Sequence, residues 1–384
     1  MTPSSSAIIV AARRSPIASR GRALSGLTVD QLAGPVLAAV ERDARRATGS
    51  SLEIDDVMLG NCVGPGGNPA RVAALAAGFG QKIPGVTIDR QCGSGLSAIA
   101  LGVDAIRAGT SRLVIAGGAE SVSTAPQRVS QGQSYDRARF APEGFPDPDM
   151  VDAAAAIAVK FLISRNRQDA FAVRSHELAL SAIAVHRFDR ELVAFGAATD
   201  DGPTSDFARV ASRFAALRDG DPAFAVTAGN SSRFNDGAAA VAIVPERDRG
   251  GAPGLRVLSH VTRGVDPALP GLGPISAVRS VLARGGHPLE NIVAIELVEA
   301  FAAQAIASLD GLGLIDGDGI VDARVNADGG SLALGHPWGA SAAVSVVRLF
   351  SRLVHGGADA GSLGIATAAV GGGMGVAMLV EVVR

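Results

Sequence analysis

Short apolar runs rich in β-branched residues alternate with alanine- and leucine-rich stretches of helical period, and this alternation constrains the fold most strongly. Ala7–Ala12 is typical of a strand, and Thr28–Ala44 has the period of a helix with Thr28 as its N-cap. Leu113–Gly117 is apolar throughout, as expected of a strand covered by helices on both faces. The βαβαβ alternation therefore predicts an α/β fold with a mostly parallel sheet.

The second half of the chain repeats the pattern of the first. Gln91–Ala98 opens a buried helix, expected over Gly93–Gly109, that leads to another strand. Gly335–Ala342 likewise precedes a helix over 339–354 and a strand that ends before Gly371–Gly373. Each half offers a reactive side chain near a helix N-terminus. We therefore predict a stack of two related sheets with one site between them.

The segment over about 119–234 has a different character. Its part over 125–148 is rich in turn residues, and two arginine-rich helices are expected over 153–161 and 166–185. Such a length is unusual for a plain connection, which favours an inserted loop domain, with a disordered linker over 125–148 as the alternative. The predicted N-terminal half, which contains the insertion, spans residues 1–245, and the C-terminal half spans 250–384.

Composition excludes several classes of protein. Hydrophobic residues make up 47% and charged residues 19% of the 384 residues, which is too apolar for a disordered chain. Charges and glycines interrupt every long apolar stretch, so no membrane span is expected. The net charge of −2 creates no positive electrostatic field that would attract nucleic acid. Two cysteines, Cys62 and Cys92, cannot form a disulfide framework or a four-ligand zinc site. We expect a cytoplasmic protein with no metal site.

Cys92 is the first candidate for chemistry, because it lies between a predicted strand and a buried helix. The positive end of the helix dipole and free N–H groups there would lower the pKa of the thiol. The alternative is a small buried core residue, which is the interpretation favoured for Cys62.

His336 is the second candidate, since glycine and proline on either side restrict its backbone. With Cys92 it would form an activated thiol nucleophile, although spacing alone does not show that the two meet. The other histidines on helical stretches, His176, His186 and His355, are expected at the surface. Gly371–Gly375 lacks the lysine of a phosphate loop, which leaves a backbone oxyanion donor or a plain tight turn.

Four blocks of the sequence resemble, in order, the active-site blocks of the thiolase family: Cys92–Gly95, Val298–Ala302, Gly335–Pro337 and Gly371–Gly375. Further stretches that match the family are Ala11–Ile17, Asn68–Arg71, Gly117–Ser121, Thr227–Ser232, Asn235–Ala239 and Asn326–Gly330. The resemblance runs from residue 7 to residue 383. It implies two βαβαβαββ halves in a five-layered stack, with a loop domain that covers coenzyme A.

The resemblance also implies roles for single residues. Cys92 would take the acyl group of an acyl-CoA as a thioester, His336 would activate it, and the N–H groups of Cys92 and Gly371 would form an oxyanion hole. Two further sets of positions follow from it: an acyl pocket at Met150, Val298, Phe301 and Ala369, and a coenzyme A contact at Ala228 and Ser232. Coenzyme A and acyl-CoA would be substrates, with no permanently bound cofactor, in a homodimer or tetramer of lipid metabolism.

Two departures from the family pattern fall at positions that serve the formation and cleavage of the carbon–carbon bond. The second catalytic cysteine is replaced by Ala369, and alanine cannot move a proton. The asparagine that holds a water is replaced by Val298. We therefore predict a CoA-dependent acyltransferase with weakened or altered Claisen chemistry. The alternatives are a working thiolase with a substitute base, and a non-catalytic partner that binds acyl-CoA or completes a hetero-oligomer.

Overall fold

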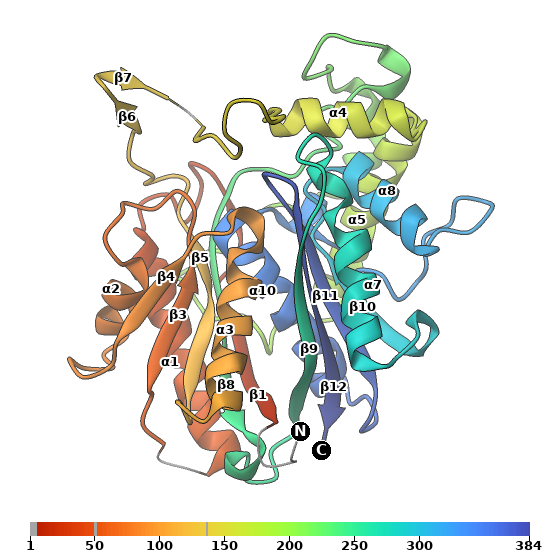
Figure 1. The fold of residues 1–384 in the computed structure, drawn as a ribbon. Helices are drawn as coiled ribbons and strands as arrows, with labels where there is room; N and C mark the ends of the chain where they lie inside the picture. The colour runs from red at the N-terminus through yellow and green to blue at the C-terminus, as the bar shows by residue number, and fades with distance from the viewer. Residues whose placement is uncertain (1–5, 50–51, 136) are drawn as a thin grey trace.

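The computed structural model describes residues 6–49, 52–135 and 137–384 of the chain. One mixed sheet runs through the molecule and takes strands from both halves of the chain (Figure 1). In spatial order it contains β10 (Ile292–Leu297), β11 (Leu363–Val370), β12 (Met374–Val383), β9 (Gly254–Gly264), β1 (Ala7–Arg14), β8 (Asn235–Pro245), β5 (Val114–Glu120), β3 (Asp56–Gly60) and β4 (Gly85–Ile88). A short β2 (Ala18–Ser19) pairs with β8, and a separate hairpin joins β6 (Val129–Ser130) to β7 (Gln133–Ser134).

The sheet consists of two halves with related strand directions. In the N-terminal half β3 is parallel to β4 and β5, and β8 runs antiparallel between β5 and β1. In the C-terminal half β10 is parallel to β11, and β12 runs antiparallel between β11 and β9. The halves meet where β1 pairs with β9, at Ile8 with Arg256 and Ile9 with Leu255. This short junction lets each half pack as a sheet of its own.

Helices form three layers around these two half-sheets (Figure 1). The central layer, between the halves, contains α3 (Ser94–Ala108) and α10 (Trp338–Leu349). The outer layers contain α1 (Val29–Thr48) and α2 (Pro69–Ala76) on one side, and α7 (Gly273–Gly285) and α8 (Ala302–Leu312) on the other. Buried apolar side chains form one central cluster and one beneath each outer layer. The predicted α/β stack of five layers is confirmed. The prediction of a mostly parallel sheet is wrong, because β1, β8, β9 and β12 pair antiparallel with their neighbours.

Glycines let the central helices approach the sheet at the end where both reactive residues lie. A Cβ built on Gly118, at β5, would lie 2.0 Å from the carbonyl oxygen of Gly339 in α10. A Cβ on Gly60, at the end of β3, would lie 2.5 Å from the backbone nitrogen of Gly95 in α3. No other residue fits such contacts. The N-termini of α3 and α10 therefore meet at the carboxyl ends of the same strands.

Between β5 and β8 the chain leaves the sheet. The helices there are α4 (Met150–Lys160), α5 (Arg165–Ala184) and α6 (Phe207–Val210), and α4 and α5 pack on α8 (Figure 1). The predicted start of α4 is three residues late, because Asp149 accepts the N–H of Val151 at 2.9 Å and caps the helix earlier. The β6–β7 hairpin projects from the body (Figure 1).

Short helical segments complete the chain. They are η2 (Gln91–Gly93), η3 (Ala211–Arg213), η4 (Pro222–Phe224), η5 (Glu246–Asp248), η6 (Pro270–Leu272), η7 (Leu289–Asn291), α9 (Ser331–Leu334) and the π-helical turn η8 (Phe350–His355). Within the described ranges, no helix is both long enough and apolar enough to cross a membrane.

His176 corrects one expectation from the sequence, because it is buried and not at the surface. Its side chain is 2% exposed, and its Nδ1 accepts the N–H of Thr204 at 3.2 Å. Its ring stacks on Phe207, with 3.9 Å between ring centroids. Burial lowers the pKa of His176 to about 4. The arginine-rich pattern of α5 does not show that a later segment covers this face.

Candidate active site

Cys92 and His336 lie in contact, although 244 positions separate them in the sequence. The Nε2 atom of His336 lies 3.3 Å from the Sγ atom of Cys92. Cys92 is in the turn η2 directly before α3, and His336 precedes α10, so the two central helices bring the pair together. Cys92 retains partial exposure, whereas His336 is 3% exposed.

Ser341 fixes which nitrogen of His336 faces the thiol. The Oγ–H of Ser341 donates to the carbonyl oxygen of Pro337 at 3.0 Å. The same Oγ lies 2.6 Å from Nδ1 of His336, so it accepts the proton that Nδ1 carries. In this tautomer Nε2 presents a lone pair to the S–H of Cys92. The arrangement suits a base that removes the thiol proton.

Burial keeps both members of the pair neutral at rest. It raises the pKa of the Cys92 thiol to about 12, against the opposing effect of the backbone N–H groups of Cys92 and Gly371. It lowers the pKa of His336 to about 4. The sequence-based expectation of a lowered Cys92 pKa is therefore wrong for the resting protein. Desolvation outweighs the helix terminus, and the nucleophile depends on transfer of a proton to His336.

The backbone N–H groups of Cys92 and Gly371 act to lower the pKa of the Cys92 thiol, against the effect of burial. Gly371 opens the glycine turn between β11 and β12, which brings the end of the C-terminal half against η2. Two convergent backbone donors beside a nucleophilic sulfur are the geometry that an oxyanion hole requires. Their role toward a substrate oxygen stays a prediction.

The backbone around His336 is held by a side chain from β8. Asn235 is buried, and its Oδ1 accepts the N–H of His336 at 3.0 Å. Gly335, with φ of +115°, lies directly against the Asn235 amide, where a Cβ would approach to 2.4 Å. Any side chain at position 335 would therefore displace the histidine.

Glu120 ties the loop after β3 to the start of α10. One carboxylate oxygen accepts the N–H groups of Cys62 and Gly339, at 3.0 and 2.9 Å. The other accepts from Val63 N–H and from Asn61 Nδ2, at 3.1 and 2.8 Å. Burial raises the pKa of Glu120 to about 6. This carboxylate supports the N-terminus of α10, and so the loop that carries His336.

Cys62 lies in this loop and differs from Cys92 in its partners. Its Sγ donates to the carbonyl oxygen of Gln91 at 3.2 Å and lies 3.5 Å from Ser94 Oγ. It is half-buried, and burial raises its pKa well above the usual range for a thiol. Neither partner can take up a proton as an imidazole does.

We predict that iodoacetamide alkylates Cys92 roughly 10²-fold faster than Cys62 at neutral pH, because His336 can accept the thiol proton. Peptide mapping after timed labelling measures both rates. In the His336→Gln variant, labelling of Cys92 should slow toward that of Cys62. Equal rates for the two thiols in the native protein would contradict the assigned pair.

The two departures from the family pattern lie at the ends of adjacent parallel strands. Val298 follows β10, and its N–H donates to the carbonyl oxygen of Thr367 in β11 at 3.0 Å. Ala369 lies two residues after Thr367 in β11. Val298 is 4% exposed, whereas Ala369 is half-buried. Neither side chain carries a group that can move a proton or hold a water.

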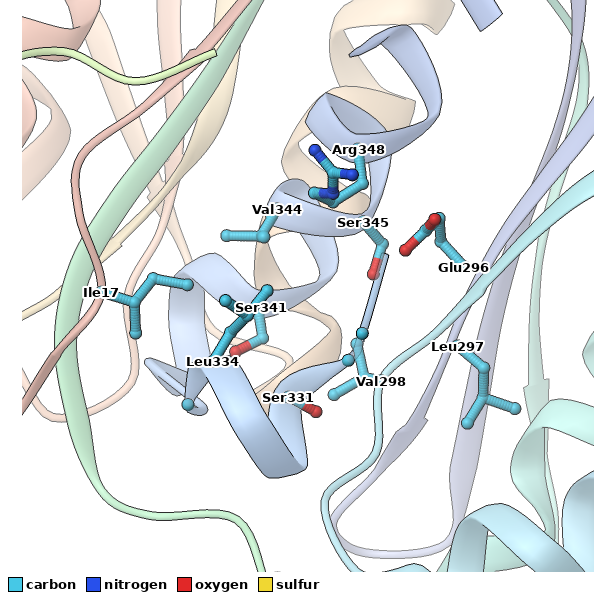
Figure 2. A pocket seen from close by; sticks show the side chains of 13 residues that line it. Ile17, Glu296, Leu297, Val298, Ser331, Leu334, Ser341, Val344, Ser345 and Arg348 are labelled. Atoms are coloured by element: carbon cyan, nitrogen blue, oxygen red, sulfur yellow. The ribbon is translucent and has the colours of Figure 1, made fainter. Parts of the chain in front are cut away.

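A small cavity of about 30 Å³ is lined by Ser341, which contacts Nδ1 of His336, and by Gly335 (Figure 2). Val298 and Ser331 line one end of it, and Arg348 of α10 lines the other. Neither Cys92 nor Ala369 is among its lining residues. The structure thus brings the strand ends of Val298 and Ala369 together but does not place both residues on this cavity.

The remaining predicted residues lie in the inserted segment or on an element that packs against it. Met150 begins α4 and Phe301 precedes α8, the two helices pack together, and both residues are half-buried. Ser232 is half-buried and Ala228 is exposed, on a segment tied to this region by the bond from Ser232 N–H to Ala300 O at 2.9 Å. Their assignment to an acyl pocket and to coenzyme A stays a prediction.

Several supporting residues escaped the sequence analysis. Asn235 and Glu120 lie in stretches that match the family pattern, and Ser341 lies four residues after one of them, but a sequence does not show which atom each one bonds. Glu299 is another. It is fully buried and accepts from Asn326 Nδ2 at 2.6 Å and from Ser175 Oγ at 2.7 Å. It thereby fixes the backbone beside Val298.

Comparison with known proteins agrees with this fold. The model of the thiolase N-terminal domain matches residues 7–247, and that of the thiolase C-terminal domain matches residues 252–382. A protein of Staphylococcus haemolyticus with the provisional name acetyl-CoA C-acetyltransferase VraB is 39% identical over 392 residues, which cover 98% of each chain. Its Staphylococcus aureus (strain MRSA252) counterpart is 39% identical over 391 residues, 97% of this chain and 98% of that protein.

The crystal structure of the Bacillus anthracis acetyl-CoA acetyltransferase superposes with a TM-score of 0.87 at 33% identity, covering 98% of this chain and 99% of that one. A neutral thiol beside an imidazole base, in this stacked α/β fold, defines an enzyme of the acyl-transfer class. The chain belongs to the thiolase family, and the predicted family resemblance is confirmed.

Proposed function

We propose that the protein is a CoA-dependent acyltransferase that carries the acyl group as a thioester on Cys92. The observation that supports this most directly is the contact between Cys92 Sγ and the lone pair of His336 Nε2. The sulfur attacks the thioester carbonyl of an acyl-CoA while its proton passes to Nε2. The N–H groups of Cys92 and Gly371 hold the oxyanion. The coenzyme A thiolate then leaves and takes the proton from His336.

The fate of the acyl group is the second part of the proposal. A Claisen condensation, or its reverse, needs a group that moves the α-proton, and Ala369 supplies none. Val298 replaces an asparagine that would hold a water, so the stabilising contact from that water is also absent. We therefore propose that carbon–carbon bond chemistry is weak, and that the acyl group passes to water, to an amine, to another thiol or to an already activated carbon acceptor.

A working thiolase with a substitute base is the second candidate, favoured by the names of the relatives at 39% identity. A non-catalytic partner that binds acyl-CoA is the third. The intact pair of Cys92 and His336 argues against it.

Thiolysis of acetoacetyl-CoA and of one longer 3-ketoacyl-CoA separates the first two candidates. The proposal expects barely measurable turnover with both substrates, although Cys92 still becomes acylated. Turnover at an ordinary enzyme rate of about 10 s⁻¹ would establish the substitute base instead. If no acyl-CoA modifies Cys92, the result supports the non-catalytic partner.

The pH profile of acylation follows from the pKa of His336. Because that pKa is lowered to about 4, Nε2 keeps its lone pair throughout the neutral range. The rate should therefore stay level from about pH 6 to 8 and fall only as protonation of His336 begins, below about pH 5. Single-turnover acylation with acetyl-CoA measures this. A rise centred near pH 6.5, the ordinary value for histidine, would contradict the buried neutral imidazole.

We also propose that the protein forms a homodimer at least, with the tetramer as an alternative. β4 is an edge strand of the sheet, and apolar side chains beside it are exposed: Val86 at 40%, Leu75 at 45% and Leu101 at 48%. A second copy would cover this edge. Light scattering at micromolar concentration should give at least a dimer mass, and a monomer would contradict the assignment.

Acyl-CoA substrates imply a place in lipid metabolism. Both cysteines are free, which suits a reducing compartment such as the cytoplasm, and we propose that setting.

A further inference from the structure

The inserted segment folds a short loop over the glycine turn of the active site. Arg137 and Asp147 close this loop, with Nη1 donating to the Asp147 carboxylate at 2.8 Å and Nη2 donating to its carbonyl oxygen at 3.0 Å. The N–H of Phe140 donates to the same carboxylate at 3.3 Å. The guanidinium of Arg137 lies 4.8 Å from the centre of the Phe140 ring. One ion pair therefore fixes both the backbone and the ring of Phe140.

The ring of Phe140 packs directly on Gly371 and Gly372. A Cβ built on Gly371 would lie 2.8 Å from Cε2 of Phe140, and one on Gly372 would lie 3.2 Å from its Cβ. A side chain at position 371 would force this ring to shift. The other aromatic side chain of the loop, Phe145, is 64% exposed and is not among the nearest atoms to Gly371 or Gly372.

The position of Gly371 brings this ring close to the reacting group. β11, which ends at Val370, packs on the turn η2 that carries Cys92, and a Cβ built on Gly93 would lie 2.7 Å from Cγ2 of Val370. Gly371 follows Val370, so an acyl carbon bonded to the Cys92 sulfur lies near Gly371. The ring contacts the same glycine. An acyl chain that lengthens toward the ring must pass it or displace it, and each methylene that fits poorly costs about tenfold or more in rate.

We infer that Phe140 sets an upper limit on the length of the acyl group carried by Cys92, and that the Arg137–Asp147 pair positions Phe140 for this task. The substrate class is then a short-chain acyl-CoA. This inference rests on the proposed function, because it requires an acyl group on Cys92. It assigns specificity to a residue outside the acyl pocket that the sequence predicts.

Competition between acyl-CoAs of different length tests the inference. The protein is mixed with equal amounts of acetyl-CoA and decanoyl-CoA, and intact-protein mass spectrometry gives the ratio of the two adducts at early times. The native protein should carry mainly the acetyl group. Phe140→Ala should raise the decanoyl-to-acetyl ratio by about tenfold or more. Phe145→Ala, in the same loop, is the matched control and should keep the native ratio.

Asp147→Asn tests the positioning role without changing the ring. It removes the charge that holds Arg137, so it should relax the preference in the same direction by a smaller factor. Both adducts form on one sample, so loss of folded protein cancels from the ratio. Should Phe140→Ala fail to fold, Asp147→Asn carries the test.

Two outcomes would overturn different statements. Adducts at Cys92 with an unchanged ratio in both variants, or a native protein without length preference, would overturn the role of Phe140 alone. Absence of any adduct from either acyl-CoA would overturn the proposed function and this inference with it.

Discussion

Replacing His336 by glutamine should slow acylation of Cys92 by about 10²–10⁴-fold. Burial raises the pKa of the thiol to about 12, so hardly any thiolate exists at neutral pH without a base. His336 Nε2, 3.3 Å from the sulfur, is that base. Rapid mixing with acetyl-CoA, acid quenching and intact-mass analysis give the acylation rate directly.

Two further variants make this result specific. Ser341→Ala removes the acceptor that fixes the tautomer of His336, so it should slow acylation by a smaller factor, about tenfold. His186→Gln changes an exposed histidine and should leave the rate unchanged. Native-like acylation in His336→Gln would show that a different group activates Cys92.

Restoring the two missing family residues should raise thiolysis of acetoacetyl-CoA from a barely measurable rate. Ala369→Cys adds a proton carrier and Val298→Asn adds an amide that can hold a water, each with an expected gain of about 10²-fold. The strand ends that carry them are joined by the bond from Val298 N–H to Thr367 O. We therefore expect coupling, with the double variant exceeding the sum of the single gains. Steady-state thiolysis measures all four proteins.

The chain offers a matched control for each change. Ala368 precedes Ala369 in β11, and successive side chains in a strand point to opposite faces, so Ala368→Cys places a thiol on the wrong side. Val293 lies in β10 and is 48% exposed, so Val293→Asn adds an amide far from the strand end. Neither control should restore thiolysis. Efficient thiolysis by the native protein, with no benefit from either restored residue, would contradict the role given to Ala369.

Local periodicity predicted the elements well, because it depends on neighbouring residues. The helix expected over Gly93–Gly109 is observed as Ser94–Ala108, and Gly109 ends it with φ of +74°. The repeat of this pattern in the second half indicated two related sheets. Matches to a known family, and not periodicity, then supplied the topology.

Periodicity does not show which distant segments of the chain contact one another. His176 was expected at the surface, and Phe207, more than thirty positions later, buries it. The pKa of Cys92 was expected to fall, whereas burial by surrounding segments raises it. Phe140 lies in a turn-rich stretch with no periodic pattern, and only the folded chain places its ring on Gly371.

Intact-protein mass spectrometry after incubation with acetyl-CoA tests whether Cys92 carries the acyl group. We expect a gain of one acetyl mass on the native protein, mapped to the peptide of Cys92, together with release of one equivalent of coenzyme A. Cys92→Ala should show no gain, while Cys62→Ala should behave as the native protein does. No adduct on the native protein and no release of coenzyme A, or an adduct that persists in Cys92→Ala, would contradict the assignment of Cys92 as the acyl carrier.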